Sequence, residues 1–312
     1  MSQPNTMYAM NMKDGAGRSV TTAVSDTVEV VVGGDTIAVE LPRVELTVDW
    51  STGAVQGSGP SNQLVSAFIP ATDCLGPARR DFTQALVTRS NQQGQFGLQT
   101  GTLDPGVGFE VAFELANGHR VYRHVFRSLG QVFVHTSRVT GRANPSSPVS
   151  LVLVDETGAE RGQVAGVANG DGWFDLSFPG VQIDPTDVVR LSASGEDPEI
   201  TVEDLSLDFS VLGGVSGTAP RDRALELELE LADGRVLTVE MVSTGLGAFS
   251  FGTADIPPRA DWDFGDVARA RVTLPTANGH EIVAEVVLEV VPPTPGPGGD
   301  YKIYLPSAMT GS

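Results

Sequence analysis

The chain has 312 residues, enough for two or three domains, because a domain typically holds roughly 100–200 residues. It carries 20 Lys and Arg against 39 Asp and Glu, and the net charge of −19 argues against a nucleic-acid partner, since phosphate contacts need basic side chains. No stretch approaches the ~20 apolar residues of a membrane span, and the single cysteine, Cys74, excludes an intramolecular disulfide framework.

The N-terminal part of the chain carries two short alternating segments, residues 28–32 and 36–41, separated by a Gly-Gly pair. Such a pair between alternating segments is typical of a β-hairpin. Residues 1–44 are therefore predicted to form a partial β unit or a hairpin extension of the unit that follows. Residues 1–12 show no basic region followed by an apolar run, so no signal peptide is expected in this numbering.

From residue 44 onward the same order of signals appears three times. Each occurrence opens with a Val-x-Gly sequence, and the three glycines, Gly57, Gly141 and Gly217, are 84 and 76 residues apart. An alternating segment follows each opening, most clearly at residues 225–231, where leucines occupy one face and glutamates the other. This period of two predicts half-buried β-strands, and no segment shows helical periodicity.

A glycine followed two residues later by phenylalanine comes next in each unit, at Phe96, Phe174 and Phe249. Because these three occupy one repeat position, each is predicted to be buried in its own unit. Asn-Gly precedes His119 in the first unit and His280 in the third, and predicts a tight hairpin. A role in the turn explains both histidines better than zinc, which needs three or four convergent ligands.

Each unit offers about seven short strands, which fits a Greek-key β-sandwich of roughly 100 residues. The Val-x-Gly-x-x-Pro opening, the Gly-x-Phe sequence and the Asp-Pro-Gly turn resemble those of bacterial Ig-like repeat domains, and are similar to the carboxypeptidase-regulatory-like sandwich, over residues 44–291. This resemblance implies a secreted or cell-surface protein. The expected fold class is all-β, a tandem array of Greek-key Ig-like β-sandwich domains, elongated and joined by short linkers.

The predicted units after the N-terminal region are repeat 1 at residues 45–135, repeat 2 at 136–211, repeat 3 at 212–291, and a Pro/Gly linker with a strand-like C-terminal tail at 292–312. In this tail Tyr301, Ile303 and Leu305 share one face of an alternating segment. We expect the tail either to pack on the third unit or to add as a strand to an open sheet edge, including that of another copy.

Two acidic loops are candidate calcium sites, because calcium prefers six to eight oxygen ligands. The first contains Asn169, Asp171 and Asp175, and the second Asp261, Asp263 and Asp266. Neither matches the twelve-residue EF-hand loop, and Asx turns ahead of strands are the alternative interpretation.

Exposed aromatic side chains are candidate carbohydrate contacts. Trp173 neighbours the buried Phe174 position and should therefore point outward, and Trp262 lies in an insertion of the third unit. Trp50 ends an alternating segment and is assigned to the core.

No nucleophile elbow, P-loop or dinucleotide fingerprint occurs, so the chain is expected not to be an enzyme and to need no cofactor other than calcium. The sequence favours an extracellular or cell-surface structural or adhesive protein, a stalk or spacer able to form filaments. Its expected partners are other copies of itself, head to tail, or cell-surface glycans and proteins. The alternative is a carbohydrate-binding module array from a larger secreted enzyme.

Overall fold

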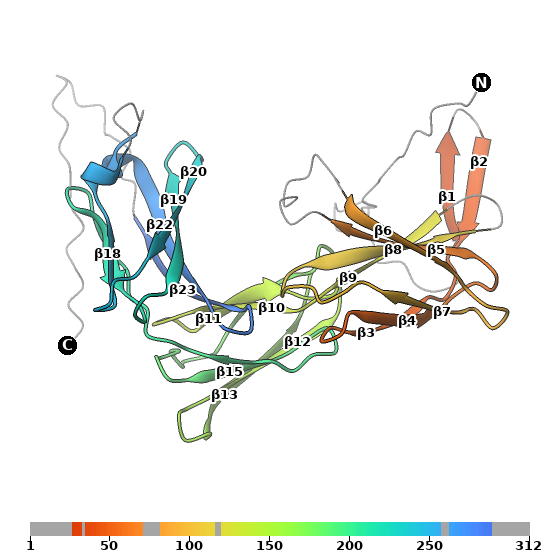
Figure 1. Ribbon diagram of the computed structural model, residues 1–312, viewed down its shortest axis with the longest axis horizontal. Helices are drawn as coiled ribbons and strands as arrows, with labels where there is room; N and C mark the ends of the chain where they lie inside the picture. The colour runs from red at the N-terminus through yellow and green to blue at the C-terminus, as the bar shows by residue number, and fades with distance from the viewer. Residues whose placement is uncertain (1–26, 33–34, 71–81, 116–119, 257–261, 289–312) are drawn as a thin grey trace.

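A computed structural model describes residues 27–32, 35–70, 82–115, 120–256 and 262–288 of the chain (Figure 1). These residues form 23 β-strands and two short 3-10 helices. No helix in this described part is long and apolar enough to cross a bilayer. The prediction of an all-β protein is therefore confirmed.

The first unit is a sandwich of two antiparallel sheets, ordered β3-β4-β7 and β6-β5-β8-β9. Its core lies between these sheets, where Phe96 and Phe113 pack edge to face with ring centroids 5.3 Å apart. The strands of this unit are β3 (Glu45–Asp49), β4 (Ala54–Ser58), β5 (Leu64–Pro70), β6 (Phe82–Arg89), β7 (Gln95–Gln99), β8 (Gly108–Glu114) and β9 (Arg120–Phe126).

The second and third units repeat this topology, with three strands facing four. In the second unit the sheets contain β10-β11-β14 and β13-β12-β15-β16, and in the third β17-β18-β21 and β20-β19-β22-β23. The strands of the second unit are β10 (Leu129–Phe133), β11 (Arg138–Arg142), β12 (Pro148–Val154), β13 (Glu160–Val167), β14 (Trp173–Ser177), β15 (Val188–Ser192) and β16 (Glu199–Thr201). Those of the third are β17 (Asp208–Ser210), β18 (Gly214–Thr218), β19 (Ala224–Leu231), β20 (Val236–Val242), β21 (Ala248–Phe251), β22 (Val267–Pro275) and β23 (Glu281–Val287).

The recurring glycine and phenylalanine of each unit are cross-strand partners. In register, Gly57 faces Phe96, Gly141 faces Phe174 and Gly217 faces Phe249. A Cβ added at any of the three glycines would lie 2.5–2.6 Å from the phenylalanine ring, so each ring occupies the space that a side chain would need. The phenylalanines are 8, 4 and 5% exposed, which confirms that they are buried.

The glycine two residues before each phenylalanine has a different structural role, in the backbone conformation of the turn. Gly172, for example, has φ of 85°, a left-handed conformation that favours glycine, and its C=O accepts the amide N–H of Ala143. A Cβ there would lie 2.5 Å from the Ala143 carbonyl oxygen. The two sequence motifs of the repeat therefore encode close packing of two strands rather than chemistry.

The N-terminal region contributes a separate hairpin of β1 (Thr27–Val32) and β2 (Asp35–Glu40), paired antiparallel in a two-stranded sheet. This is the hairpin that the Gly-Gly pair predicts. The predicted tail residues Tyr301, Ile303 and Leu305 lie outside the described residues.

The second and third units share a sheet. Strand β10 pairs in parallel with β23, which joins the two units in one seven-stranded sheet, β14-β11-β10-β23-β22-β19-β20. Their buried apolar side chains form one continuous cluster, whereas those of the first unit form another. The three sandwiches follow a bent path with the second unit at the turn, rather than a straight rod (Figure 1).

Strand pairing places the unit boundaries slightly earlier in the chain than the sequence motifs suggest. Strand β10 lies before residue 136 but pairs with β11, and β17 lies before residue 212 but pairs with β18. The reason is that the first strand of each unit precedes the Val-x-Gly motif and carries no recurring sequence of its own.

Candidate functional site at the unit junctions

The first and second units are joined by only two residues, Arg127 and Ser128, which lie between β9 and β10. The hairpin between β15 and β16 holds this linker through Glu196. One Glu196 carboxylate oxygen accepts the amide N–H of Ser128 at 3.1 Å and its hydroxyl at 2.9 Å, and the other accepts Arg127 Nε at 3.3 Å. Arg127 also donates to the carbonyl oxygen of Leu103 in the first unit, at 2.5 Å.

A second contact between these units is made by an arginine on an aromatic ring. The Arg142 guanidinium on β11 lies 3.9 Å from the ring centroid of Phe126 on β9, and 5.3 Å from that of Trp173. Burial lowers the pKa of Arg142, and its Nε has no hydrogen-bond partner among the described residues. The cation–π contacts and the negative charge of Asp171 offset part of the cost of burying this cation.

The third unit reaches the same junction through the hairpin between β22 and β23. His280 is 3% exposed, and its Nδ1 accepts the amide N–H of Gly130 on β10 at 3.0 Å. Burial, with a smaller contribution from the charge of Arg127, lowers the pKa of His280 to about 4, so the ring is neutral and able to accept. Asn278 in this hairpin donates to the carbonyl oxygen of Glu199 at 2.8 Å.

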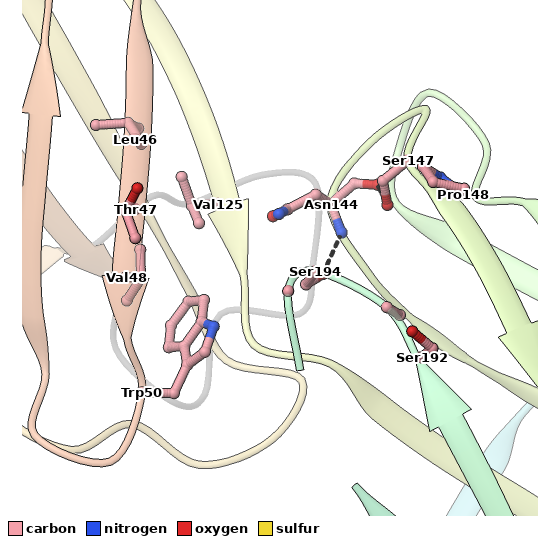
Figure 2. A pocket seen from close by; sticks show the side chains of 12 residues that line it. Leu46, Thr47, Val48, Trp50, Val125, Asn144, Ser147, Pro148, Ser192 and Ser194 are labelled. Carbon is pink, nitrogen blue, oxygen red and sulfur yellow. Dashed lines mark hydrogen bonds between the residues drawn. The ribbon is translucent and has the colours of Figure 1, made fainter. Parts of the chain in front are cut away.

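Figure 2 shows a pocket of about 470 Å³ between the first and second units. Its volume falls within the roughly 300–1,000 Å³ of small-molecule sites. The first unit contributes an apolar wall from β3 and its neighbours, and the second a wall rich in hydroxyl groups and backbone. The lining residues are Leu46, Thr47, Val48, Trp50, Val125, Asn144, Ser147, Pro148, Ser192, Ala193, Ser194 and Gly195.

Several polar groups of the pocket are already engaged with one another. The side-chain Oδ1 of Asn144 accepts the backbone N–H of Phe126 at 2.8 Å, and the backbone N–H of Asn144 donates to Ser194 Oγ at 2.9 Å. Ser147 Oγ donates to the Asn144 carbonyl oxygen at 2.7 Å. The pocket lining contains no ionisable side chain, so the pocket is suited to bind a neutral polar molecule rather than to transfer protons.

In the first of the two acidic loops, oxygens of Asn169 and Asp175 are engaged by groups of the protein itself. Asn169 Oδ1 accepts the amides of Asp171 and Trp173, both at 2.9 Å, which is an Asx turn. Asp175 lies on β14 and pairs with Arg138 through two contacts of 2.8 and 3.1 Å. Across the residues that the structure describes, no three His, Cys, Asp or Glu side chains are grouped so as to hold a metal ion.

In the second acidic loop the carboxylates cap a 3-10 turn (Phe264–Asp266). Asp263 Oδ1 accepts the amide of Gly265 at 2.7 Å, and Asp266 Oδ2 accepts that of Asp263 at 2.9 Å. Asp261 lies outside the described residues.

The two candidate carbohydrate tryptophans lie in different units and do not form one platform. Trp173 is 44% exposed on β14, as its position next to Phe174 predicts. Trp262 is half-buried and packs edge to face on Phe264, with ring centroids 5.9 Å apart. Trp50 is buried against Phe109 as predicted, but it also lines the pocket, which the sequence does not reveal.

The fold defines a class, a tandem array of β-sandwiches in which three strands face four. No protein-family model and no curated protein matches the sequence. Among solved structures, the chain is similar to a tetra-tandem repeat from the extending region of a large adhesion protein (17% identity, 79% of this chain and 73% of that chain, TM-score 0.22). It is also similar to the BSP domain of a biofilm-associated protein (10%, 80% and 67%, 0.20) and to the FN1–FN3 domains of chicken CNTN1 (10%, 79% and 98%, 0.18). Scores this low carry no information on function.

Proposed function

We propose that this chain is a non-enzymatic structural segment of an extracellular or cell-surface protein, a spacer whose bends are set by contacts between its sandwiches. The observation that carries the proposal is the parallel pairing of β10 with β23, which joins one sheet from each of two successive units into a continuous sheet. A flexible tether between domains would need neither a shared sheet nor a shared core.

The junction with the first unit supports the same role. A two-residue linker whose amides and side chains are hydrogen-bonded leaves little freedom for the first sandwich to swing, because each bond must break before the backbone can rotate. The net charge of −19 keeps such an array soluble and discourages lateral contacts between copies. An adhesive role would be exercised by the ends or faces that this spacer presents.

Small-angle scattering tests the spacer. A compact globule of 312 residues would have a radius of gyration of about 20 Å. We expect a larger value that stays constant from low to high salt, because a shared sheet holds one junction and partly buried polar contacts hold the other. A radius that increases steadily with salt, or a profile typical of freely jointed domains, would contradict a fixed spacer.

A second candidate function, glycan binding, is favoured by the pocket rather than by Trp173 and Trp262. The pocket combines a tryptophan ring and aliphatic side chains with hydroxyl groups, and this combination complements the apolar faces and the hydroxyl groups of a sugar. A glycan array with the full chain tests it. Binding lost on filling the pocket with Ser192→Tyr, but retained in Trp173→Ala, would support this function, and no binding by the unmodified chain would exclude it.

A further inference from the structure

The pairing that joins the second and third units has a defined register. Gln131, Val132 and Phe133 of β10 lie opposite Glu281, Ile282 and Val283 of β23, in parallel. The amide N–H of Val134 donates to the carbonyl oxygen of Val283 at 2.9 Å, and Gln131 Nε2 donates to Glu281 Oε2 at 2.7 Å. The first strand of one unit thus adds to the last strand of the next.

The internal repeat identifies the equivalents of both strands. Gln131 of β10 pairs with Thr140 of the Val-Thr-Gly motif, and Asp208 of β17 pairs with Ser216 of the Val-Ser-Gly motif, so β17 is the third unit's counterpart of β10. The Ala-Asn-Gly-His sequence precedes Arg120 in β9 as it precedes Glu281 in β23. Strand β9 is therefore the first unit's counterpart of β23.

Both counterpart strands are edges in the described part of the chain. Strand β9 pairs only with β8, and β17 only with β18. The amide of Phe126 points away from β8, because it donates to Asn144 Oδ1. Successive residues of a strand direct their backbone N–H and C=O groups to opposite edges. The backbone groups of Arg120 and Tyr122 therefore also point away from β8, as those of Glu281 and Val283 point toward β10. Such an edge is a template for another strand.

We infer that β9 of one copy of this chain accepts β17 of another copy, in the parallel register of β23 and β10. In this register Asp208 takes the place of Gln131 and Arg120 the place of Glu281. The hydrogen bond from Gln131 to Glu281 within one chain would thus be replaced by an ion pair between Asp208 of one copy and Arg120 of another. Phe209 would lie opposite Val121, as Val132 lies opposite Ile282.

The charges on the two edges agree with this pairing. Strand β9 carries Arg120 in a chain of net charge −19, whereas Asp208 and the nearby Asp204 are acidic. Within the chain Arg120 contacts Glu114 at 3.3 Å, but both side chains are about half exposed, so exchange of this partner for Asp208 costs little. Opposite charge across the contact favours this pairing over β9 with β9.

The contact joins two different surfaces and therefore propagates. Each copy has one β9, in its first unit, and one β17, in its third unit. A heterologous contact of this kind gives an open chain unless its rotation closes into a ring. This inference goes beyond the spacer role, which would stand if the chain were monomeric.

Sedimentation velocity over a range of concentrations tests the inference. The full chain should show species that grow with concentration, and Arg120→Asp should weaken association about tenfold or more, because it opposes Asp208 with a like charge. The double variant Arg120→Asp with Asp208→Arg should restore it. Arg221→Asp, the same charge change at an exposed residue of the third unit, is the matched control and should leave association unchanged. Growth in Arg120→Asp equal to that of the unmodified chain would contradict the pairing.

Cross-linking fixes the register and is independent of charge. In a Cys74→Ser background, a copy carrying Arg120→Cys is mixed with a copy carrying Asp208→Cys, whose backbones should lie as close as neighbouring strands and allow a disulfide. We expect a disulfide-linked dimer in the mixture, and little with either copy alone. A mixture that cross-links no better than a mixture of Arg120→Cys with Glu156→Cys, or a chain that is monomeric at every concentration, would overturn the inference.

Discussion

The two junctions of this molecule hold neighbouring sandwiches together through different kinds of contact. The first and second units are joined by a two-residue linker and by polar contacts to Glu196, and they leave a pocket between them. The second and third are joined by residues 202–207, a longer connection that lets the chain turn back so that β23 pairs with β10. The junction with the shorter linker is thus held by side chains, and the junction with the longer linker by a shared sheet.

The largest expected effect concerns the core that the second and third units share. Phe174→Ala should lower the free energy of unfolding by roughly 3–5 kcal/mol, because it removes a buried ring that packs on Gly141. The loss should appear in a transition common to both units, since their apolar side chains form one cluster. Calorimetry of the full chain measures it.

The matched control is Phe96→Ala, the same change in the first unit. It should lower a different transition and leave the shared one in place, because its core is a separate cluster. Three transitions that shift one at a time, with Phe174→Ala affecting only the second unit, would break the contrast between the junctions.

The next effect concerns acid. The pKa of His280 is about 4 in the folded chain and 6.5 ordinarily, so folding favours the neutral ring. The contribution of neutral His280 to the free energy of unfolding is therefore fully present above about pH 6.5. It falls as the pH drops toward 4 and levels off below, with a total loss of about 3 kcal/mol. Denaturant unfolding at pH 7 and at pH 4 measures this difference.

His280→Asn isolates this residue from the carboxylates that titrate over the same range. Asn retains an acceptor for the Gly130 amide but carries no proton at low pH. We expect the variant to lose most of the excess acid sensitivity. An unchanged difference between the two pH values would show that His280 is not the group responsible.

A smaller effect is expected at the glycines that face phenylalanines. A Cβ at Gly141 would lie 1.9 Å from the Leu129 carbonyl oxygen and 2.6 Å from the Phe174 ring, so Gly141→Ala should cost roughly 1–3 kcal/mol. Gly97→Ala, where the nearest atom is 3.9 Å away, should be nearly neutral. Equal unfolding midpoints in urea for the two variants would contradict the packing account.

The smallest effect concerns the polar junction. Glu196→Ala removes the acceptor of Ser128 and Arg127 and should cost about 1–2 kcal/mol, detected as earlier unfolding of the first unit. Glu199→Ala removes an exposed pair with Arg190 and should cost less than about 1 kcal/mol. A larger effect of Glu199→Ala would mean that the linker is held by other contacts.

Local sequence patterns predict the sandwiches but not their junctions. The alternating leucines of residues 225–231 and the Gly-x-Phe motif report on strands and on packing inside one unit, because both depend on neighbours close in the fold. The β10–β23 pairing joins residues about 150 positions apart, and neither strand differs in sequence pattern from other edge strands. The pairing of β10 with β23 is therefore visible only in the three-dimensional structure.

For the site residues too, the sequence predicts local features but not contacts between units. The burial of Trp50 follows from its position after an alternating segment, but its place in a pocket follows from the second unit lying opposite. His280 reads in sequence as a hairpin residue, and its bond to Gly130 appears only in three dimensions. Oxygen-rich loops such as that of Asn169 are ambiguous in sequence, because an Asx turn and a cation site use the same residue types.

We expect the second and third units to move as one body, whereas the first unit is held to them by side chains. Pulsed electron spin resonance tests it most directly in a Cys74→Ser background, with labels at the exposed residues Glu156 and Ala232 for one junction and at Gln92 and Glu156 for the other. We predict a narrow distance distribution for the first pair that Glu196→Ala leaves unchanged, and a broader distribution for the second pair in that variant. A broad distribution between Glu156 and Ala232 in the unmodified junction would contradict the shared sheet.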